Sequence, residues 1–425
     1  MIYFLTIGFM AVLLIGIPVA FSLGIAGLLG FISSSSSVAF SVIAQKMMTS
    51  LNNFILLAVP LFILAAKLMN TAGITKKIFS FADTCVGFMP GGLGHANAFA
   101  SLIFAGMSGA AVADVAGLGQ IELDAMADAG YDKGFSVAIT AASSTIGPIF
   151  PPSIPMLVFA LASGVSVGRL FLGGIVPGVL MTVSLMVMVW IYAVKRKYPR
   201  KPFPTLKLFA QSLYNALLPL LTPVILLGGI WTGFFTPTEA AAVAVFYAIL
   251  IGTLVLKELN LKIIVDIFID TAKETAIIGF IITTAAFCGW ILMRTGITIR
   301  ISQAFLSISA NPLLVLYTIN IFLLILGCFL DSTVSILILS PILVPVIEQL
   351  GIDPVHFGVV MVLNLMLGLL TPPFGVVLFV IQHISKLSFA KVVKETMPFL
   401  VPLFIVLFLT TTFPGIVLWL PNLLY

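Results

Sequence analysis

Seven long stretches without a single Lys, Arg, Asp or Glu limit what this chain can fold into more than any other feature. They run over 1–45, 134–168, 170–194, 208–238, 301–330, 355–385 and 396–425. An α-helix needs about 20 mostly apolar residues to cross the hydrocarbon core of a bilayer. Charged residues make up 8% of the chain, far below the roughly 25% of a globular domain. We therefore predict an all-α polytopic membrane protein. A β-barrel is excluded because its strands would alternate polar and apolar residues.

The same sequence excludes several functions. The cysteines are few and far apart with no CxxC spacing, so neither a disulfide framework nor a zinc cluster is indicated. The histidines are equally scattered, and we expect them to be core or interfacial side chains. No GxxxxGK(S/T) phosphate loop occurs, so the chain does not hydrolyse nucleotide. The net charge of +5 fits the loop bias of an inner-membrane protein better than nucleic-acid binding. No organic cofactor is expected.

Apolar runs between charges and turn residues predict membrane spans near 2–31, 51–70, 133–163, 168–194, 209–232, 236–256, 275–293, 356–383 and 396–421. Two further apolar regions, 84–120 and 311–349, are interrupted midway by Gly, Pro, Ser and Asp. We interpret both as re-entrant helical hairpins. The amphipathic segments 38–50 and 261–274 either lie flat at the interface or form connecting loops.

Basic residues predict the orientation, because short loops rich in Lys and Arg stay in the cytoplasm. The densest basic cluster lies in loop 195–208. If each span crosses once and each hairpin returns to its own side, 15 of the 20 basic residues are cytoplasmic. The N-terminus is then cytoplasmic and the C-terminus periplasmic. The first 30 residues are too long and too uncharged for a cleaved signal peptide and are predicted to be the first span.

An internal repeat relates the two halves of the chain. A shift of 221 residues aligns without a gap Gly106 with Gly327, Gly130 with Gly351, Asp132 with Asp353, Pro151-Pro152 with Pro372-Pro373, and Pro177 with Pro398. The model of spans places an odd number of crossings between the two proline pairs, so the halves have opposite orientations. Inverted repeats of this kind are typical of secondary transporters.

Each half contributes one hairpin tip and one broken span. The first tip is 106–110 and the first break runs from Ser143 to Ser153; the second tip is 327–333 and the second break runs from Asn364 to Gly375. The proline pairs must unwind their helices, and unwound backbone at membrane depth is tolerated where it lines a cavity. Freed carbonyls and hydroxyls can coordinate a small hard cation, and helix N-termini can face an anion. The alternative is four purely structural kinks.

Acidic residues within apolar sequence need separate interpretation. Asp331 between two apolar runs indicates an ion path or, alternatively, a helix cap. Asp114 has no acidic counterpart in the repeat and is a weaker candidate. Glu239 in Thr236-Pro237-Thr238-Glu239 fits a helix start. We expect the remaining acidic group to be a solvated face of a cytoplasmic loop: Glu122, Asp124, Asp128 and Asp132.

Several motifs together resemble one family. They are GMSGAAVADVAGLG (106–119), SSTIGPIFPPSIPM (143–156), GFFTPTEAAAVA (233–244), LDSTVSILILSPILVP (330–345) and LGLLTPPFG (367–375). As a set they are similar to the large membrane subunit of tripartite ATP-independent periplasmic (TRAP) transporters. The resemblance implies a sodium-driven elevator transporter for organic acids, typically C4-dicarboxylates or sialic acid. It also implies two partners, a small four-helix membrane subunit and a periplasmic substrate-binding protein.

On this basis we predict the parts and sites of the chain. The first repeat, 1–200, comprises a scaffold (1–83), a hairpin with a broken span (84–163) and a span (168–194). The second, 201–425, comprises a scaffold (209–293), a hairpin with a broken span (311–383) and a last span (396–421). Sodium is expected at Ser108, Gly109, Ser143, Ser144, Thr145, Gly147, Gly327, Asp331, Ser332, Thr333, Asn364, Gly368 and Thr371. Substrate is expected near Pro152, Ser153, Pro373, Phe374 and Gly375.

Two other classes of function compete with this prediction. A channel or passive scaffold subunit would have a continuous polar pore lining in place of paired discontinuities. An intramembrane enzyme would need a nucleophile with a base, or paired carboxylates, and none is evident in the sequence. No Lys or Arg lies in the breaks, so the substrate carboxylate is expected to be held by backbone N–H groups, hydroxyls and bound sodium.

Overall fold

The computed structural model describes residues 7–9, 11–13, 15–33, 39–294, 296, 300, 303 and 311–425. All secondary-structure elements in this part of the chain are helical. Seven of its helices are long and apolar enough to cross a membrane, or eight if one sharply bent pair is counted as a span. The predicted all-α polytopic membrane protein is confirmed.

The helices of the first half are α2 (Val19–Ser33), α3 (Ser41–Leu51), η1 (Phe54–Leu57), α4 (Ala58–Thr71), α5 (Ile74–Val86), α6 (Gly92–Ser108), α7 (Ala111–Gly117), α8 (Gly119–Asp128), α9 (Lys133–Ser144), α10 (Ile154–Ser163) and α11 (Val167–Arg196). Those of the second half are α12 (Leu206–Trp231), α13 (Pro237–Leu250), the π-helix η2 (Ile251–Val255), α14 (Leu261–Arg294), α16 (Pro312–Gly327), α17 (Ser332–Gln349), α18 (Pro354–Gly368), α19 (Val376–Ser385), α20 (Phe389–Thr412) and α21 (Gly415–Leu424).

Local sequence explains where several helices begin. Asp132 and Asp353 stand at the N-caps of α9 and α18. Thr236 and Glu239 form a complete capping box at the start of α13, with Pro237 in the first turn. Each arrangement satisfies or complements N–H groups that a helix start leaves unpaired. The predicted helix start at Glu239 is therefore confirmed.

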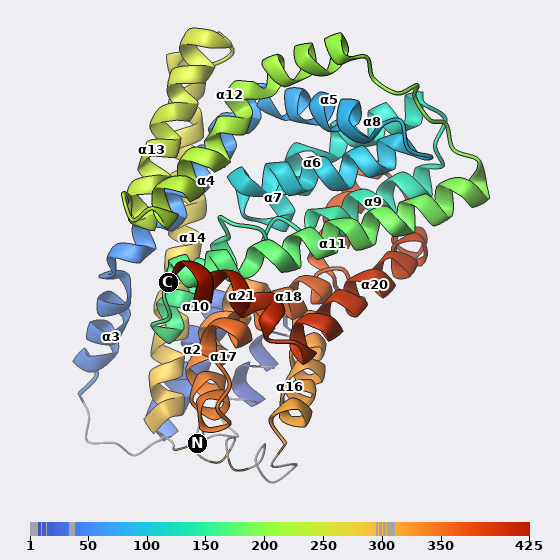
Figure 1. Ribbon diagram of the computed structural model, residues 1–425. Helices are drawn as coiled ribbons and strands as arrows, with labels where there is room; N and C mark the ends of the chain where they lie inside the picture. The colour runs from blue at the N-terminus through green and yellow to red at the C-terminus, as the bar shows by residue number, and fades with distance from the viewer. Residues whose placement is uncertain are drawn as a thin grey trace.

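Helices α4, α13 and α14 form one side of the molecule (Figure 1). Helix α13 packs on α4 and α12, and α14 packs on α2, α3, α4 and α17. On the other side, α6, α9, α11, α18 and α20 pack on one another, and α10 packs on α17. A continuous apolar core joins the two sides and includes fully buried aromatic rings, among them Phe62, Phe135, Phe159, Phe357 and Phe399.

The four predicted interruptions occur where the sequence places them. Helices α6 and α7 meet at Gly109-Ala110 with a bend of 118°. Non-helical backbone separates α9 from α10 over 145–153, α16 from α17 over 328–331, and α18 from α19 over 369–375. The α6–α7 pair has the geometry of a broken or re-entrant element. Helix α17, in contrast, is long and apolar enough to cross a membrane by itself.

Three predicted boundaries are wrong. The last span, predicted over 396–421, is α20 followed by a separate helix α21 that packs on α11, because Pro414 prevents α20 from continuing. The predicted interfacial segment 261–274 is continuous with the following span in the 34-residue helix α14, since no Pro or Gly interrupts it before Gly279. Of the first span, 2–31, the described part turns at Ile15-Gly16, where Gly16 has φ 89°, before α2 begins.

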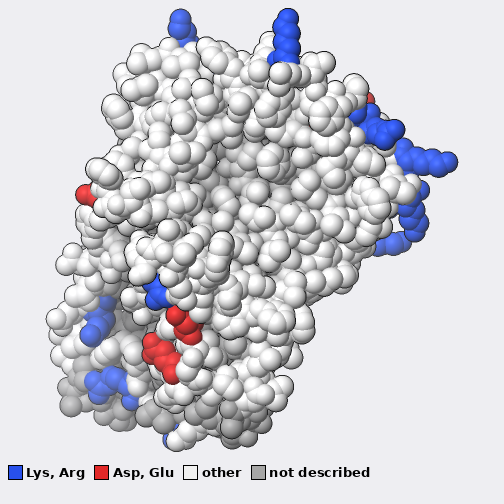
Figure 2. Space-filling model, viewed as in Figure 1, with Lys and Arg blue, Asp and Glu red and all other residues white. Residues whose placement is uncertain are grey.

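Charged side chains are distributed as expected for a membrane protein. Figure 2 shows Lys and Arg at the upper and right-hand edges and again at the lower left, with a broad uncharged zone between them on this face. Many large apolar side chains are exposed on the protein surface, including Val183, Trp190, Val224, Phe246 and Ile405. An apolar surface of this extent is suited to contact with lipid or with another membrane subunit.

Candidate transport site

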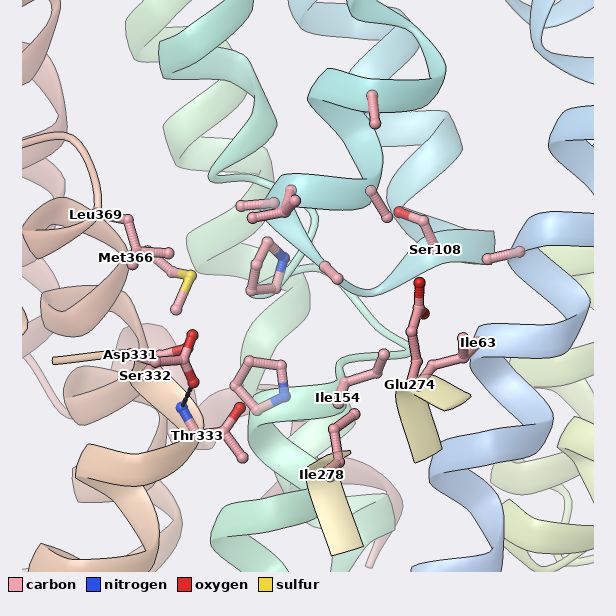
Figure 3. A pocket seen from close by; sticks show the side chains of 18 of the residues that line it. Ile63, Ser108, Ile154, Glu274, Ile278, Asp331, Ser332, Thr333, Met366 and Leu369 are labelled. Carbon is pink, nitrogen blue, oxygen red and sulfur yellow. Dashed lines mark hydrogen bonds between the residues drawn. The ribbon is translucent and has the colours of Figure 1, made fainter. Parts of the chain in front are cut away.

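A cavity of about 470 Å³ lies where the α6–α7 bend (the first tip) and the α16–α17 connection (the second tip) meet α4 and α14. Its lining also includes the start of α10 and the end of α18. Figure 3 shows Asp331, Ser332 and Thr333 on one side of the cavity, and Glu274 with Ser108 on the other. The first turns of α10 and α17 contribute to the wall, so the positive ends of two helix dipoles face the space.

The first hairpin tip packs directly against the first break. Gly109 adopts φ 62°, and a Cβ atom there would lie 2.5 Å from the carbonyl oxygen of Pro152. The backbone N–H of Ile154 donates to the carbonyl of Gly109 at 3.2 Å. Ser108 lines the cavity, and its buried hydroxyl has no hydrogen-bond partner within the described residues. Only glycine fits this close approach with a left-handed backbone.

The predicted sodium residues of the first break are buried together. Ser144 and Thr145 donate to carbonyls three residues earlier, at 2.8 and 2.7 Å. The Ser143 hydroxyl donates to Oδ1 of Asn97 on α6 at 2.7 Å. A Cβ atom on Gly147 would lie 3.7 Å from the backbone carbonyl oxygen of Ala110 in the first tip. The first break and the first tip are thus in contact near Gly147 and Ala110.

The second tip and the second break also meet. A Cβ atom on Gly368 would lie 2.6 Å from the carbonyl carbon of Gly327, so α16 and α18 are in backbone contact here. Asp331 caps α17 by accepting a hydrogen bond from the N–H of Thr333 at 2.8 Å. Asp331, Ser332 and Thr333 all line the cavity. Asp331 therefore has the geometry of a helix cap and also faces the cavity.

Asn364 is fully buried within α18, whereas Thr371 is only partly buried in the break that follows this helix. The side-chain N–H group of Asn364 donates to the backbone carbonyl of Asn320 at 2.9 Å and to its side-chain oxygen at 3.2 Å. Oδ1 of Asn364 is buried without a hydrogen-bond partner in the described chain. Thr371 donates to the carbonyl of Leu367 at 2.7 Å. Neither Asn364 nor Thr371 lines the cavity, but the unpaired Asn364 oxygen is available to a cation.

The predicted substrate residues are not gathered at the cavity. Ser153 is fully buried, caps α10 through the N–H of Met156 at 3.1 Å, and donates to the carbonyl of Pro148. Phe374 is 53% exposed and packs on Phe329. The cavity lining comes instead from neighbouring residues of the two broken spans, namely Pro148, Ile154, Pro155, Met366 and Leu369. The five predicted residues, Pro152, Ser153, Pro373, Phe374 and Gly375, lie behind or beside this wall.

Two charged residues of the cavity were missed by sequence reasoning. Lys67 on α4 and Glu274 on α14 line it, and their Nζ and Oε1 atoms are 2.7 Å apart. The breaks themselves contain no Lys or Arg, as predicted, but Lys67 reaches the cavity from a neighbouring helix. The local signal was the spacing of Ile63, Lys67 and Asn70, which places all three on one face of α4.

The prediction that Glu122 belongs to a solvated face is wrong. Its three acidic neighbours in the group are exposed, but Glu122 itself is 1% exposed and accepts a hydrogen bond from Nδ2 of Asn97 at 2.7 Å. Helix α8 packs on α6 and α9 and turns this residue inward. Asp114 on α7 is also buried. A buried acid is therefore connected through Asn97 to Ser143, a predicted sodium residue.

Outside the spans, one charged cluster joins the start of α9 to the end of α11. Asp132 accepts hydrogen bonds from the Tyr198 hydroxyl at 2.6 Å and from Arg196 at 3.0 Å. The hydrogen bond from Tyr198 lowers the pKa of Asp132 below its usual value, and the neighbouring Arg196 lowers this pKa further. Burial raises the pKa of Tyr198 to about 12.

Among the described residues, no group of three or more His, Cys, Asp and Glu side chains could hold a metal ion. The cysteines are far apart in the fold as well as in the sequence, with Cys85 on α5, Cys288 on α14 and Cys328 after α16. Any cation at this site would therefore be held mainly by hydroxyl, amide and backbone oxygens, and Asp331 and Glu274 are the carboxylates among the described residues that line the cavity.

Comparison with known proteins gives consistent results. Residues 6–416 match the family model described as the DctM component of tripartite ATP-independent periplasmic transporters. The chain is 46% identical to the sialic acid TRAP transporter large permease protein SiaM of Vibrio cholerae, over 98% of this chain and 97% of that protein. It is 36% identical to the C4-dicarboxylate TRAP transporter large permease protein DctM of the same species, over 100% of this chain and 97% of that protein.

Two further comparisons bear on the fold and on the assembly. The crystal structure of the Alcanivorax borkumensis YdaH transporter is similar with a TM-score of 0.65, 14% identity and 90% of each chain covered, which shows a shared transporter fold. The isethionate TRAP transporter permease protein DctMQ of Oleidesulfovibrio alaskensis is 38% identical over 95% of this chain, but this match spans only 64% of that longer protein. The chain therefore belongs to the DctM family of TRAP transporters and is a multi-pass permease component, not an enzyme.

Proposed function

We propose that this chain carries out sodium-coupled uptake of an organic acid anion across a bacterial inner membrane by an elevator mechanism. The observation that carries the proposal is the cavity at which both hairpin tips and the ends of both broken spans face α4 and α14. The site lies between two broken spans on one side and the long helix α14 with α4 on the other. This arrangement fits an elevator, in which the broken spans move together with their ligands while α4 and α14 stay fixed. Sialic acid and C4-dicarboxylates are the substrate classes named for its relatives.

Correspondence between the halves supports an inverted repeat over 1–200 and 201–425. Gly130 and Gly351 both have positive φ, at 78° and 72°, directly before α9 and α18. Pro177 and Pro398 lie inside α11 and α20. In this proposal the hairpins with their broken spans, 84–163 and 311–383, move as one unit. The segments 1–83 and 209–293 form the scaffold, and α11 and α20 are flanking spans.

The oxygen chemistry of the breaks supports a role for sodium. A hard cation prefers several hydroxyl, amide, carbonyl or carboxylate oxygens. The first site would use Ser108, Gly109, Ser143, Ser144, Thr145 and Gly147, and the second Gly327, Asp331, Ser332, Thr333, Asn364, Gly368 and Thr371. The sites differ, because Asp331 and Asn364 correspond in the repeat to Ala110 and Ser143. The substrate would then lie in the cavity, against the residues of the two broken spans that line it, namely Pro148, Ile154, Pro155, Met366 and Leu369.

We also propose the partners and the orientation. A small four-helix membrane subunit would cover part of the exposed apolar scaffold surface, and a periplasmic substrate-binding protein would deliver the anion. The longer DctMQ relative, of which this match spans about two thirds, supports the first of these partners. The basic loop bias predicts a cytoplasmic N-terminus and a periplasmic C-terminus.

Uptake into proteoliposomes that contain this permease with its two partners tests the proposal. We expect accumulation of labelled sialic acid or succinate only when a sodium gradient is imposed, and a higher sodium requirement after Ser108→Ala or Ser144→Ala. Equilibration without accumulation would indicate a channel, and uptake that proceeds without this chain would indicate a passive scaffold subunit. Unchanged sodium dependence in both variants would move the first sodium site elsewhere.

A further inference from the structure

Lys67 is the only Lys or Arg among the described residues that line the cavity. It projects from the α4 face that also carries Ile63, Ala66 and Asn70. These positions are three and four residues apart and so form a single stripe along the helix. This stripe stands across the cavity from the second hairpin tip at Asp331, as Figure 3 shows for Ile63 on the same helix.

The Lys67 ammonium is already paired. Its Nζ atom lies 2.7 Å from Oε1 of Glu274 on α14. The two side chains are 29% and 51% exposed, so neither is locked by packing, and the pair can exchange partners with a soluble ligand. An ion pair this accessible contributes little to stability. Its place in the cavity wall therefore calls for an explanation other than the attachment of α4 to α14.

The charges around the cavity favour such an exchange. Besides Lys67, the described lining contains two carboxylates, Glu274 and Asp331. An organic acid anion that enters this space meets two negatively charged carboxylates and one ammonium group, and this ammonium is already paired with Glu274. Sodium near Asp331 would offset one negative charge. The anion then binds well only if Lys67 gives up at least one of its three N–H donors to the incoming carboxylate.

We propose that Lys67 binds the substrate carboxylate by exchanging partners with Glu274, and that Glu274 competes with the substrate for this ammonium. The inference rests on the proposed function of the site. Since α4 and α14 belong to the proposed scaffold, this contact forms only in the position of the moving unit seen here. Lys67 thus recognises the anion at one end of the movement, and Glu274 assists its release at that same end.

Opposite effects of two substitutions distinguish this proposal from a structural ion pair. Lys67→Gln should weaken the binding of sialic acid by about tenfold, the scale of one charge-assisted hydrogen bond. Glu274→Gln should tighten it by roughly threefold, because an exposed competitor of modest strength is removed. A pair that only joined α4 to α14 would change binding in the same direction in both variants.

The measurement is the dissociation constant of sialic acid, with succinate as a second probe, from the thermal shift of the purified permease in sodium chloride. Lys67→Arg keeps the charge and should stay close to wild type. Lys273→Gln is the matched control, since Lys273 pairs with Asp270 at 3.0 Å on α14 and lies outside the cavity lining. It should leave the dissociation constant unchanged.

The outcomes separate this inference from the proposed function. If the wild-type permease binds neither acid in sodium, the proposed function and this inference both fail. If it binds one of them but Lys67→Gln and Glu274→Gln shift the constant in the same direction, or not at all, the exchange between Lys67 and Glu274 is refuted while sodium-coupled transport stands. A Lys67→Arg variant as weak as Lys67→Gln would also refute it.

Discussion

Gly109→Ala should be among the most damaging single-methyl changes in this protein. The left-handed backbone of Gly109, φ 62°, costs an alanine roughly 1–2 kcal/mol. The added Cβ would also lie 2.5 Å from the Pro152 carbonyl oxygen, a backbone atom that cannot rotate away. Overpacking of this kind typically costs about 1–3 kcal/mol. Together the two terms predict that the free energy of unfolding falls by about 2–5 kcal/mol.

Gly164→Ala separates the two terms. Gly164 follows α10 with φ 76°, yet nothing lies within 4 Å of where its Cβ would be. It should therefore carry the backbone cost alone. We would compare the thermal unfolding midpoints of both variants at one scan rate and in one detergent, and the sodium concentration for half-maximal uptake. Gly109→Ala should have the lower midpoint and the higher sodium requirement. Equal midpoints would refute the close contact between the first tip and the first break.

Three further predictions follow from contacts described above. Asp331→Asn should leave the protein folded, because an amide oxygen can still cap α17, but should reduce sodium-driven uptake severalfold; wild-type uptake would limit Asp331 to capping. Two cysteines outside the cavity lining, one on α6 and one on α12, which pack on each other, joined by a bifunctional reagent in a background without native cysteine, should block uptake but preserve binding from one side. Full turnover would exclude an elevator. The Tyr198 hydrogen bond lowers the pKa of Asp132, so its contribution to stability is present above the unfolded-state pKa and is lost as pH falls through the folded value; Asp132→Asn should therefore lower the unfolding midpoint at pH 7, and this difference should shrink as the pH falls through the folded-state pKa.

Features that depend on local chemistry could be predicted from the sequence. The sequence marks the four interruptions with proline pairs or with glycines beside hydroxyl residues, and all four lie where these residues predicted them. The continuity of α14 does not follow from the sequence in the same way, because the polar residues of 261–274 indicate a separate interfacial segment or loop before the membrane span. Polarity alone does not end a helix, and a single Pro need not end one either, since Pro177 and Pro398 lie inside α11 and α20.

Features that depend on packing between distant segments could not be predicted. The Nζ atom of Lys67 and the Oε1 atom of Glu274 are 2.7 Å apart, but the two residues are far apart in the chain. Nothing in the sequence around either residue indicates that the other is its partner. The burial of Glu122 likewise depends on how α8 packs on α6 and α9. The sequence indicates that 119–132 is polar, but only the fold decides which carboxylate faces inward.

The direction in which the buried hydroxyls donate decides which sign of charge the breaks can hold. Ser144, Thr145 and Thr371 each give their single proton to a backbone carbonyl of the helix that precedes the break. A carbonyl can only accept, so these three oxygens are left with lone pairs alone to offer a ligand. They are thus electron-pair donors that suit a cation and cannot donate a hydrogen bond to a carboxylate. The anion must find its donors elsewhere, at helix N-termini, at the free hydroxyl of Ser108 or at a side chain of the opposite wall.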